Sequence, residues 1–180
     1  MVDPDLALID ATGRGDMEAF ESLVKRYQGP LLNFITRYVR DRSMAEDITQ
    51  EVFLGIYRAA PRFQARTKVS TWIFQIAYNR AMTELGRRKR REDLHDVLCR
   101  SREEGAGEPM SSPAEHYGLE QEVMSAIGRL PDNQRAALLL RVNEELSYRE
   151  IGDILGVSIQ SVESLIFRAR TTLRRHFKKN

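Results

Sequence analysis

The 180-residue sequence is poor in several features that mark whole classes of protein. Its single cysteine, Cys99, excludes a disulfide framework within the chain and fits a reducing compartment. No run approaches the roughly 20 apolar residues that a membrane span needs. Asp3, Asp5 and Asp10 stand where a secretory signal peptide would be basic and then apolar. We therefore expect a cytoplasmic protein.

Net charge is also small, because the formal charge is only +2 although 30% of the residues are charged. Any electrostatic function must therefore depend on where the charges lie and not on their sum. Basic residues are concentrated in one unbroken run and in a second group at the C-terminus: Arg87, Arg88, Lys89, Arg90 and Arg91, then Arg174, Arg175, Lys178 and Lys179.

Apolar residues repeat every three to four positions along most of the chain, and alternation with a period of two is rare. This periodicity predicts an all-α fold. Asp16 begins a helical stretch that Gly29 and Pro30 interrupt, which predicts two helices or one broken helix. Ser43 and Glu46 then form a capping-box pattern at the start of a helix that should end near residue 60.

A polar loop over residues 62–69 precedes the next expected helix, which Ser70 or Thr71 can cap and which should end with Gly86 and the basic run. Residues 92–118 are rich in Gly, Pro and Ser and predict a flexible linker. The sequence thus divides into two small helical domains, over residues 1–91 and 119–180. In the second domain a helix starts at Pro131 and Asp132.

Ser147 and Glu150 form a second capping box, and Gly156 lies in a tight turn between two short helices, which is the anatomy of a helix-turn-helix motif. Such a motif places its second helix in the major groove of DNA. Successive residues on a helix turn by 100°, so one side of this helix is apolar: Val162, Leu165, Ile166, Ala169 and Leu173. The opposite side carries groups that can bond base edges, reach guanine or phosphate, or touch a thymine methyl group: Gln160, Ser161, Ser164, Phe167, Arg168 and Thr171. The alternative is a helical hairpin whose polar side faces water, with Phe167 covered by the linker.

The helix that begins at Ser43 also has two different sides. Ala45, Ile48, Val52 and Ile56 align as a core stripe, while the opposite side carries Asp47, Gln50, Glu51 and Leu54. An apolar residue among carboxylates predicts a docking surface with an apolar centre and a rim that attracts basic groups. The alternative is a solvated face with one isolated leucine.

Aromatic residues Phe63, Trp72, Phe74 and Tyr78 occur among basic and amide residues before the basic run. This mixture suits single-stranded DNA, whose bases stack on rings while its phosphates bind cations. Some of these rings must instead belong to the core, and we expect Trp72 to be at least half buried. We favour phosphate binding by the basic run over a merely solvated helix end.

No metal site is expected. His95 and Cys99 are two candidate ligands and do not make a closed tetrahedral site. The neighbouring acids Glu46 and Asp47 point about 100° apart on a helix and have no histidine near them, which argues against acid–base chemistry.

Two blocks of this sequence resemble the extracytoplasmic-function (ECF, group 4) class of bacterial sigma factors in the sigma-70 family. Residues 45–54 (AEDITQEVFL) and 71–79 (TWIFQIAYN) are similar to sigma region two. Leu130-Pro131 with Arg135, residues 147–152 (SYREIG) and residues 166–170 (IFRAR) are similar to sigma region four. The blocks occur in this order on either side of the expected linker, so the resemblance covers nearly the whole chain.

The resemblance implies a transcription initiation factor that performs no covalent chemistry itself and needs no cofactor. Asp47, Gln50, Glu51 and Leu54 would bind the clamp helices of the largest subunit of RNA polymerase. Melting and capture of the promoter's minus-ten element, with one base flipped out, would involve Phe63, Arg66, Lys68, Ser70, Thr71, Trp72, Gln75, Asn79, Arg80, Arg87, Arg88 and Lys89.

The second domain would read the minus-thirty-five element as duplex DNA and touch the polymerase flap. The residues implied are Arg149, Ser158, Gln160, Ser161, Ser164, Phe167, Arg168 and Arg170. This chain has Glu163 and Leu165 where family members usually carry basic residues, so the usual phosphate or base contacts cannot be made there. Glu163 can instead accept a hydrogen bond from cytosine N4 or weaken binding near phosphates. The resemblance also implies an anti-sigma protein as a partner.

Three other functions remain open at this stage. A helix-turn-helix repressor or activator would bind duplex DNA alone and have no use for the Leu54 face. A nucleic-acid-processing enzyme would use Glu46, Asp47 and Glu51 with a divalent ion. A protein-interaction adaptor would tolerate changes in the basic run and at Phe167 without losing any nucleic-acid binding.

Overall fold

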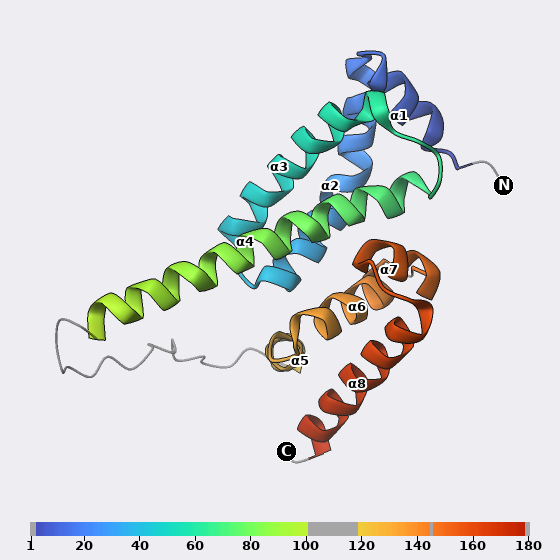
Figure 1. The fold of residues 1–180 in the computed structure, drawn as a ribbon. Helices are drawn as coiled ribbons and strands as arrows, with labels where there is room; N and C mark the ends of the chain where they lie inside the picture. The colour runs from blue at the N-terminus through green and yellow to red at the C-terminus, as the bar shows by residue number, and fades with distance from the viewer. Residues whose placement is uncertain (1–2, 101–118, 145, 179–180) are drawn as a thin grey trace.

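The computed structural model describes residues 3–100, 119–144 and 146–178, and these ranges contain helices and no strand. The all-α prediction is therefore confirmed for this part of the chain (Figure 1). None of the helices described is both long and apolar enough to cross a membrane. In chain order the elements are α1 (Leu6–Gly13), α2 (Met17–Val39), α3 (Arg42–Ala59), the short 3-10 helix η1 (Ala60–Arg62), α4 (Val69–Arg100), α5 (Leu119–Gly128), α6 (Asp132–Asn143), α7 (Tyr148–Leu155) and α8 (Ile159–Lys178).

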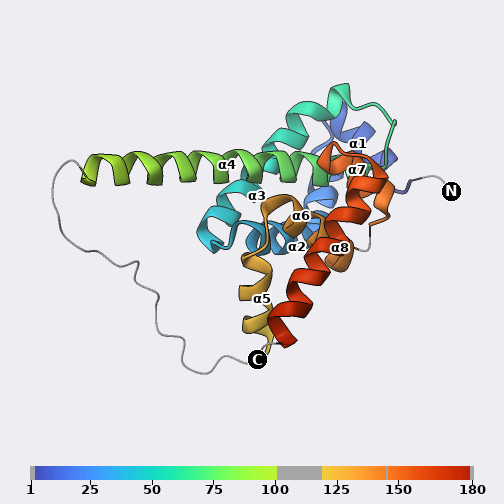
Figure 2. The same ribbon diagram turned by 60° about the horizontal axis from the view of Figure 1, so that its bottom comes forward.

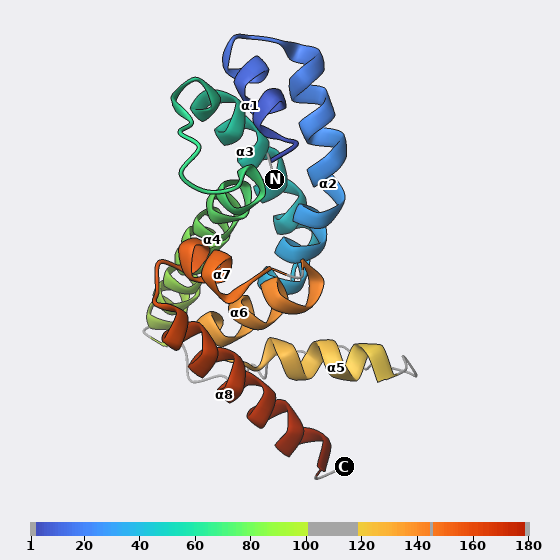
Figure 3. The ribbon, with the colours of Figure 1, turned by 90° about the vertical axis from the view of Figure 1, so that its right-hand side faces the viewer.

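The helices form two groups, an N-terminal lobe of α1 to α4 and a C-terminal lobe of α5 to α8 (Figure 1). Helix α7 packs against α4, and α6 packs against α2, so the two lobes touch along both helix pairs (Figure 3). The far end of α4 extends beyond the rest of the molecule (Figure 2).

Helix α4 does not end where the sequence predicted. Gly86 and the basic run lie inside it, and it continues to Arg100, well into the expected linker. A single glycine weakens a helix by only about 1 kcal/mol and does not remove any backbone hydrogen bond. Residues 101–118 of the predicted linker lie outside the described residues.

Helix α2 runs unbroken through Pro30, so the predicted interruption is wrong. Proline removes one helical hydrogen bond and crowds the preceding turn, at a cost of roughly 3 kcal/mol. The same helix buries Tyr27, Leu31, Phe34 and Ile35. Each large apolar side chain buried contributes about 1.5–3 kcal/mol, so packing outweighs the local cost.

The helix starts agree with the sequence only in part. Asp16 caps α2 as predicted, by accepting hydrogen bonds from the backbone N–H groups of the first turn, and the capping box of Ser147 and Glu150 is present at the start of α7. The predicted box of Ser43 and Glu46 is wrong, because α3 begins two residues earlier. Its cap is Asp41, whose Oδ1 accepts from the Met44 N–H at 3.0 Å.

The start of α4 is also different from the prediction. Neither Ser70 nor Thr71 caps this helix, since both lie inside it. The N–H group of its first residue, Val69, instead donates to the Asp3 carboxylate at 2.7 Å. The cap therefore comes from the N-terminal segment of the chain.

One hydrophobic core runs through both lobes. In the N-terminal lobe Phe34 stacks on Tyr38 with ring centroids 5.9 Å apart, and it meets Phe74 edge-on at 5.8 Å. The guanidinium of Arg135, from α6, lies over the Tyr38 ring at 5.0 Å. Arg135 itself is buried, and its guanidinium donates to the Gly128 carbonyl at 3.1 Å and to the Asp132 carboxylate. This arginine therefore joins the turn before α6 to the other lobe.

Candidate docking and nucleic-acid surfaces

Helix α3 presents the predicted docking face to solvent. Ala45, Ile48, Val52 and Ile56 are buried against the lobe, as predicted. The opposite side is exposed, with Leu54 retaining 53% of its accessible surface, and it carries Asp47, Gln50, Glu51 and Leu54. Tyr57, which was not predicted to belong to this face, lies one turn after Leu54 and is also exposed; its ring packs against Phe20 with centroids 5.1 Å apart. Its i, i+3 spacing from Leu54 was the available signal.

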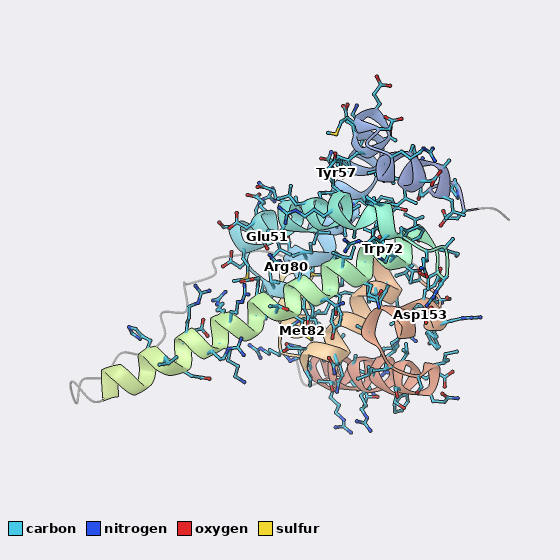
Figure 4. All side chains as sticks on the ribbon, turned by 45° about the horizontal axis from the view of Figure 1, so that its top comes forward. Glu51, Tyr57, Trp72, Arg80, Met82 and Asp153 are labelled. Atoms are coloured by element: carbon cyan, nitrogen blue, oxygen red, sulfur yellow. The ribbon has the colours of Figure 1, made fainter. Side chains whose placement is uncertain are left out.

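A charged groove of about 460 Å³ continues this face toward α4. Its acidic side includes Asp47 and Glu51, and its basic side includes Arg87 and Arg91. The guanidinium of Arg80 donates to the Glu51 carboxylate, so this predicted DNA-binding residue joins α4 to the docking face (Figure 4). The docking face and the nucleic-acid surface are thus neighbours.

The loop before α4 and one side of α4 carry the exposed part of the predicted minus-ten surface. Phe63 meets the Trp72 ring edge-on with centroids 4.9 Å apart, and both rings are only partly exposed. Trp72 is therefore mostly buried, as expected. Arg66 and Asn79 are exposed near them along the chain. An aromatic pair between exposed polar and basic groups is suited to receive an unpaired base.

Three other residues of the predicted minus-ten surface are either bonded to the C-terminal lobe or buried. Lys68 Nζ lies 2.8 Å from Glu150 Oε1, and Gln75 Nε2 donates to the Asp153 carbonyl of α7 at 3.0 Å. Thr71, one helical turn before Gln75, retains only 2% of its surface. In this arrangement Lys68 and Gln75 are bonded to α7 and Thr71 is buried, although Lys68 keeps most of its side-chain surface exposed.

The contact between Lys68 and Glu150 changes how both groups titrate. Its hydrogen bond to Glu150 raises the pKa of Lys68. Partial burial acts to raise the pKa of Glu150, but hydrogen bonds from Lys68 and Ser147 outweigh it and leave that pKa below its usual value. Because both shifts favour the charged forms, the pair stabilises the contact between lobes at neutral pH.

The basic run lies within the projecting half of α4. Arg87 pairs with Glu84 at 2.7 Å, and Arg88 pairs with Glu92 at 2.8 Å and with Asp41 at 3.4 Å. Lys89 is exposed. Consecutive helical residues point about 100° apart, so the run surrounds the helix and cannot contact a single strand with all five residues.

The helix-turn-helix motif of the C-terminal lobe has the predicted geometry. Helix α7 ends at Gly156, which adopts a left-handed conformation with φ of 68°, and α8 follows. Val162, Ile166 and Ala169 are buried. Leu165 and Leu173 are half-buried, as predicted for the same side.

The outer side of α8 faces solvent and is the candidate duplex-reading surface. Phe167 retains 71% of its accessible surface, so none of the described residues covers it. Gln160, Ser161, Ser164 and Arg168 line a groove of about 420 Å³, and Glu163 contributes to an adjacent groove beside Phe167. Of the remaining predicted residues, Arg149 and Arg170 are exposed, and Ser158 caps α8 by accepting from the Ser161 N–H at 3.2 Å.

The described residues contain no cluster of three or more groups that would suit a metal ion. Glu46 and Glu51 are paired with Arg42 and Arg80. The side chain of Cys99 lies outside the described part of the structure.

Comparison with known proteins finds the same two parts of the chain. The family model "Sigma-70 region 2" matches residues 23–91, and "Sigma-70, region 4" matches residues 120–173. The RNA polymerase sigma-H factor of Pseudomonas aeruginosa is 36% identical, over 94% of this chain and 91% of the relative. The ECF RNA polymerase sigma-E factor of Haemophilus influenzae is also 36% identical, over 92% and 91%, and that of Escherichia coli K12 is 34% identical, over 94% and 92%.

Two solved structures have a similar fold. The structure of CnrH in complex with the cytosolic domain of CnrY matches with a TM-score of 0.72 and 22% identity, over 98% of both chains. The sigma factor RpoE of Bartonella quintana, solved with the anti-sigma factor NepR, matches with a TM-score of 0.69 and 23% identity, over 88% of this chain and 96% of that one.

Proposed function

Because this chain belongs to the extracytoplasmic-function sigma factors of the sigma-70 family, which direct transcription initiation, we propose that the surfaces described above divide polymerase and promoter binding between them. The observation that carries the proposal is the presence, on one chain, of two exposed helix faces with different chemistry. The α3 face has an apolar centre among carboxylates, and the α8 face has amide, hydroxyl, aromatic and guanidinium groups.

The α3 face docks on the clamp helices of the largest polymerase subunit. Leu54 and Tyr57 form its apolar centre, and Asp47 and Glu51 attract basic residues on the partner. An exposed apolar centre with a polar rim is the usual anatomy of a protein interface.

The loop before α4 and the adjoining side of α4 melt and hold the minus-ten element. Phe63 and Trp72 stack with an unpaired base while Arg66 and Asn79 bind its polar edges and phosphates. Flipping a base costs a few kcal/mol, which this stacking offsets. Lys68 and Gln75 contribute fully only after the lobes separate, because both are bonded to α7 in this arrangement.

Helix α8 reads the minus-thirty-five element as duplex DNA. Gln160, Ser164 and Arg168 bond base edges, and Phe167 contacts a thymine methyl group. Glu163 accepts from cytosine N4 or keeps phosphates away, so the preferred sequence differs from that of relatives with basic residues there.

We further propose that the chain acts in the cytoplasm beside polymerase, which performs all the covalent chemistry, and that an anti-sigma protein holds it inactive. The support for the last point is that the similar structures of CnrH and RpoE were solved with CnrY and with the anti-sigma factor NepR.

The test is to mix the purified chain with bacterial core RNA polymerase and map transcript starts on genomic templates. We expect promoter-specific transcripts that core polymerase alone does not make. Failure to form a stable complex or any specific transcript would refute the proposal. Hydrolysis of DNA that a chelator abolishes would instead favour an enzyme. Duplex binding without polymerase would favour a repressor or activator.

Two sets of variants separate sequence-specific recognition of DNA from general affinity for DNA. Arg168→Ala should relax sequence preference at one duplex position by about 1–3 kcal/mol. Neutralising Arg87, Arg88 and Lys89 should weaken binding to all sequences and flatten its salt dependence. Competition binding with single-base promoter variants at several salt concentrations measures both effects. If both sets weaken all sequences equally, the division of labour is wrong.

A further inference from the structure

The N-terminal segment holds the start of helix α4 through one carboxylate. Asp3 Oδ1 accepts from the Asp5 N–H at 3.0 Å, and Asp3 Oδ2 accepts from the Val69 N–H at 2.7 Å. The same residue's carbonyl accepts from the Leu6 N–H at 3.2 Å, at the start of α1. Asp3 therefore ties together the N-terminal ends of α1 and α4, which are more than 60 residues apart in the sequence.

A second acid of this segment makes a parallel contact deeper in the lobe. Asp5 retains 5% of its surface, accepts a hydrogen bond from the Tyr27 hydroxyl, and pairs with Arg26. Burial raises the pKa of Tyr27 to about 12, so it stays a protonated donor at neutral pH. Asp5 thus holds the segment that carries Asp3 against α2, through both Tyr27 and Arg26.

The start of α4 depends on residues that are distant in the sequence, because no neighbouring side chain among the described residues caps it. The first N–H groups of a helix have no partner within it, and a nearby carboxylate stabilises them through hydrogen bonding and the helix dipole. Val69 is apolar and fully buried, and its neighbours Ser70 and Thr71 lie inside the helix. The residues before it, 63–68, form the loop that ends on this cap, and Trp72 lies one turn after it.

We propose that Asp3 and Asp5 are positioning residues for the minus-ten surface, although neither contacts DNA. Their bonds hold the start of α4 so that the loop and Trp72 present a preformed site to the flipped base. This inference rests on the proposed function. The N-terminal segment is in this respect part of the promoter-melting apparatus.

The experiment uses the full chain with core polymerase and promoter DNA that carries 2-aminopurine in the minus-ten element, whose fluorescence rises when the base unstacks. Asp3→Ala should lower the open-complex equilibrium about fivefold, the change that corresponds to loss of one helix cap. Asp3→Asn, which keeps an acceptor oxygen, should restore most of the signal. Asp10→Ala is the matched control, because Asp10 is an exposed acid on α1 that pairs only with Arg14 among the contacts described.

Two further readouts distinguish positioning from general destabilisation. Asp3→Ala should bind core polymerase like the wild type and should discriminate less between consensus and substituted bases in a single-stranded minus-ten oligonucleotide. In the free protein, Trp72, the only tryptophan, should become easier to quench in Asp3→Ala and not in Asp3→Asn or Asp10→Ala.

Unchanged melting and unchanged discrimination in Asp3→Ala would overturn the inference, as would an equal loss of polymerase binding. If the wild type itself fails to form open complexes, the proposed function is wrong. Quenching of Trp72 still decides in that case whether Asp3 positions the loop.

Discussion

At the scale of single residues, Leu54 offers the sharpest test of polymerase docking. Leu54→Asp should weaken binding to core RNA polymerase more than tenfold, because it buries an unpaired charge at the centre of an interface. The lobe should remain folded, since Leu54 is exposed in the free protein. Fluorescence anisotropy with labelled chain measures the affinity, and circular dichroism checks the fold.

Leu94→Asp is the matched control for this variant. Leu94 is exposed on the projecting part of α4, with 61% of its surface accessible, and lies outside the α3 face. It should bind core polymerase like the wild type when DNA is absent. If Leu54→Asp binds as tightly as Leu94→Asp, the α3 face is not the docking surface.

Exposure of individual site residues followed from helix periodicity where the neighbours of a helix leave one of its sides free. The outward position of Leu54 and of Phe167 was predictable because each lies opposite a regular apolar stripe. The contact of Gln75 with the Asp153 carbonyl was not, because a second lobe packs against a side of α4 that looks solvent-facing from its own lobe.

At the scale of elements, the helix-turn-helix motif depends on a close approach at Gly152. A Cβ atom there would lie 2.8 Å from the Val157 carbonyl oxygen, which is a backbone atom of the turn. The Val157 N–H also donates to the Gly152 carbonyl, so the turn and this part of α7 are held close together. Gly152→Ala should therefore destabilise the C-terminal lobe by about 1–3 kcal/mol, as overpacking does, and weaken duplex binding.

Gly29→Ala provides the opposite expectation in the same chain. Gly29 lies within α2, and a Cβ atom there meets nothing within 4 Å. Alanine should stabilise the protein by roughly 0.5–1 kcal/mol, because it loses less conformational freedom on folding. Urea unfolding followed by circular dichroism measures both variants. A shift in the same direction for both would contradict the close approach at Gly152.

At the scale of the whole molecule, the two lobes form a closed arrangement that the proposed function requires to open. Glu150→Gln tests this arrangement because glutamine can still serve in the capping box of α7 but cannot form an ion pair with Lys68. The open fraction should rise about twofold to fivefold, the range expected for one partly exposed ion pair.

Energy transfer between dyes on the two lobes measures opening, with Arg58→Cys and Arg174→Cys as attachment sites in a Cys99→Ser background. Glu163→Gln, on the exposed side of α8, is the control and should leave the distance unchanged. Equal distances in both variants would show that the pair does not hold the lobes together.

The same pair predicts a pH dependence of closure. Glu150 has a lowered pKa in the closed form. Its contribution to the stability of the closed form is therefore fully present above the usual carboxyl pKa of 4.5 and is lost as the pH falls through the lowered pKa. The wild type should therefore open under acidic conditions more steeply than Glu150→Gln. Identical acid profiles for the two proteins would show that protonation of Glu150 does not cause the opening.

The sequence by itself determined the local features of this protein. Regular spacing of apolar residues specified the helices and which side of α3 and α8 faces outward, and short-range chemistry specified the caps at Asp16 and Ser147. These features depend on residues within one or two turns of each other, so their geometry follows from the helix itself.

The tertiary structure alone decided the features that depend on distant residues. Packing of buried side chains kept α2 continuous through Pro30, the N-terminal Asp3 capped α4 in place of Ser70 or Thr71, and the C-terminal lobe bonded to Lys68 and Gln75. Each outcome results from contacts between segments far apart in the chain, whose energies exceed the local preferences from which the helix ends and exposed faces were predicted.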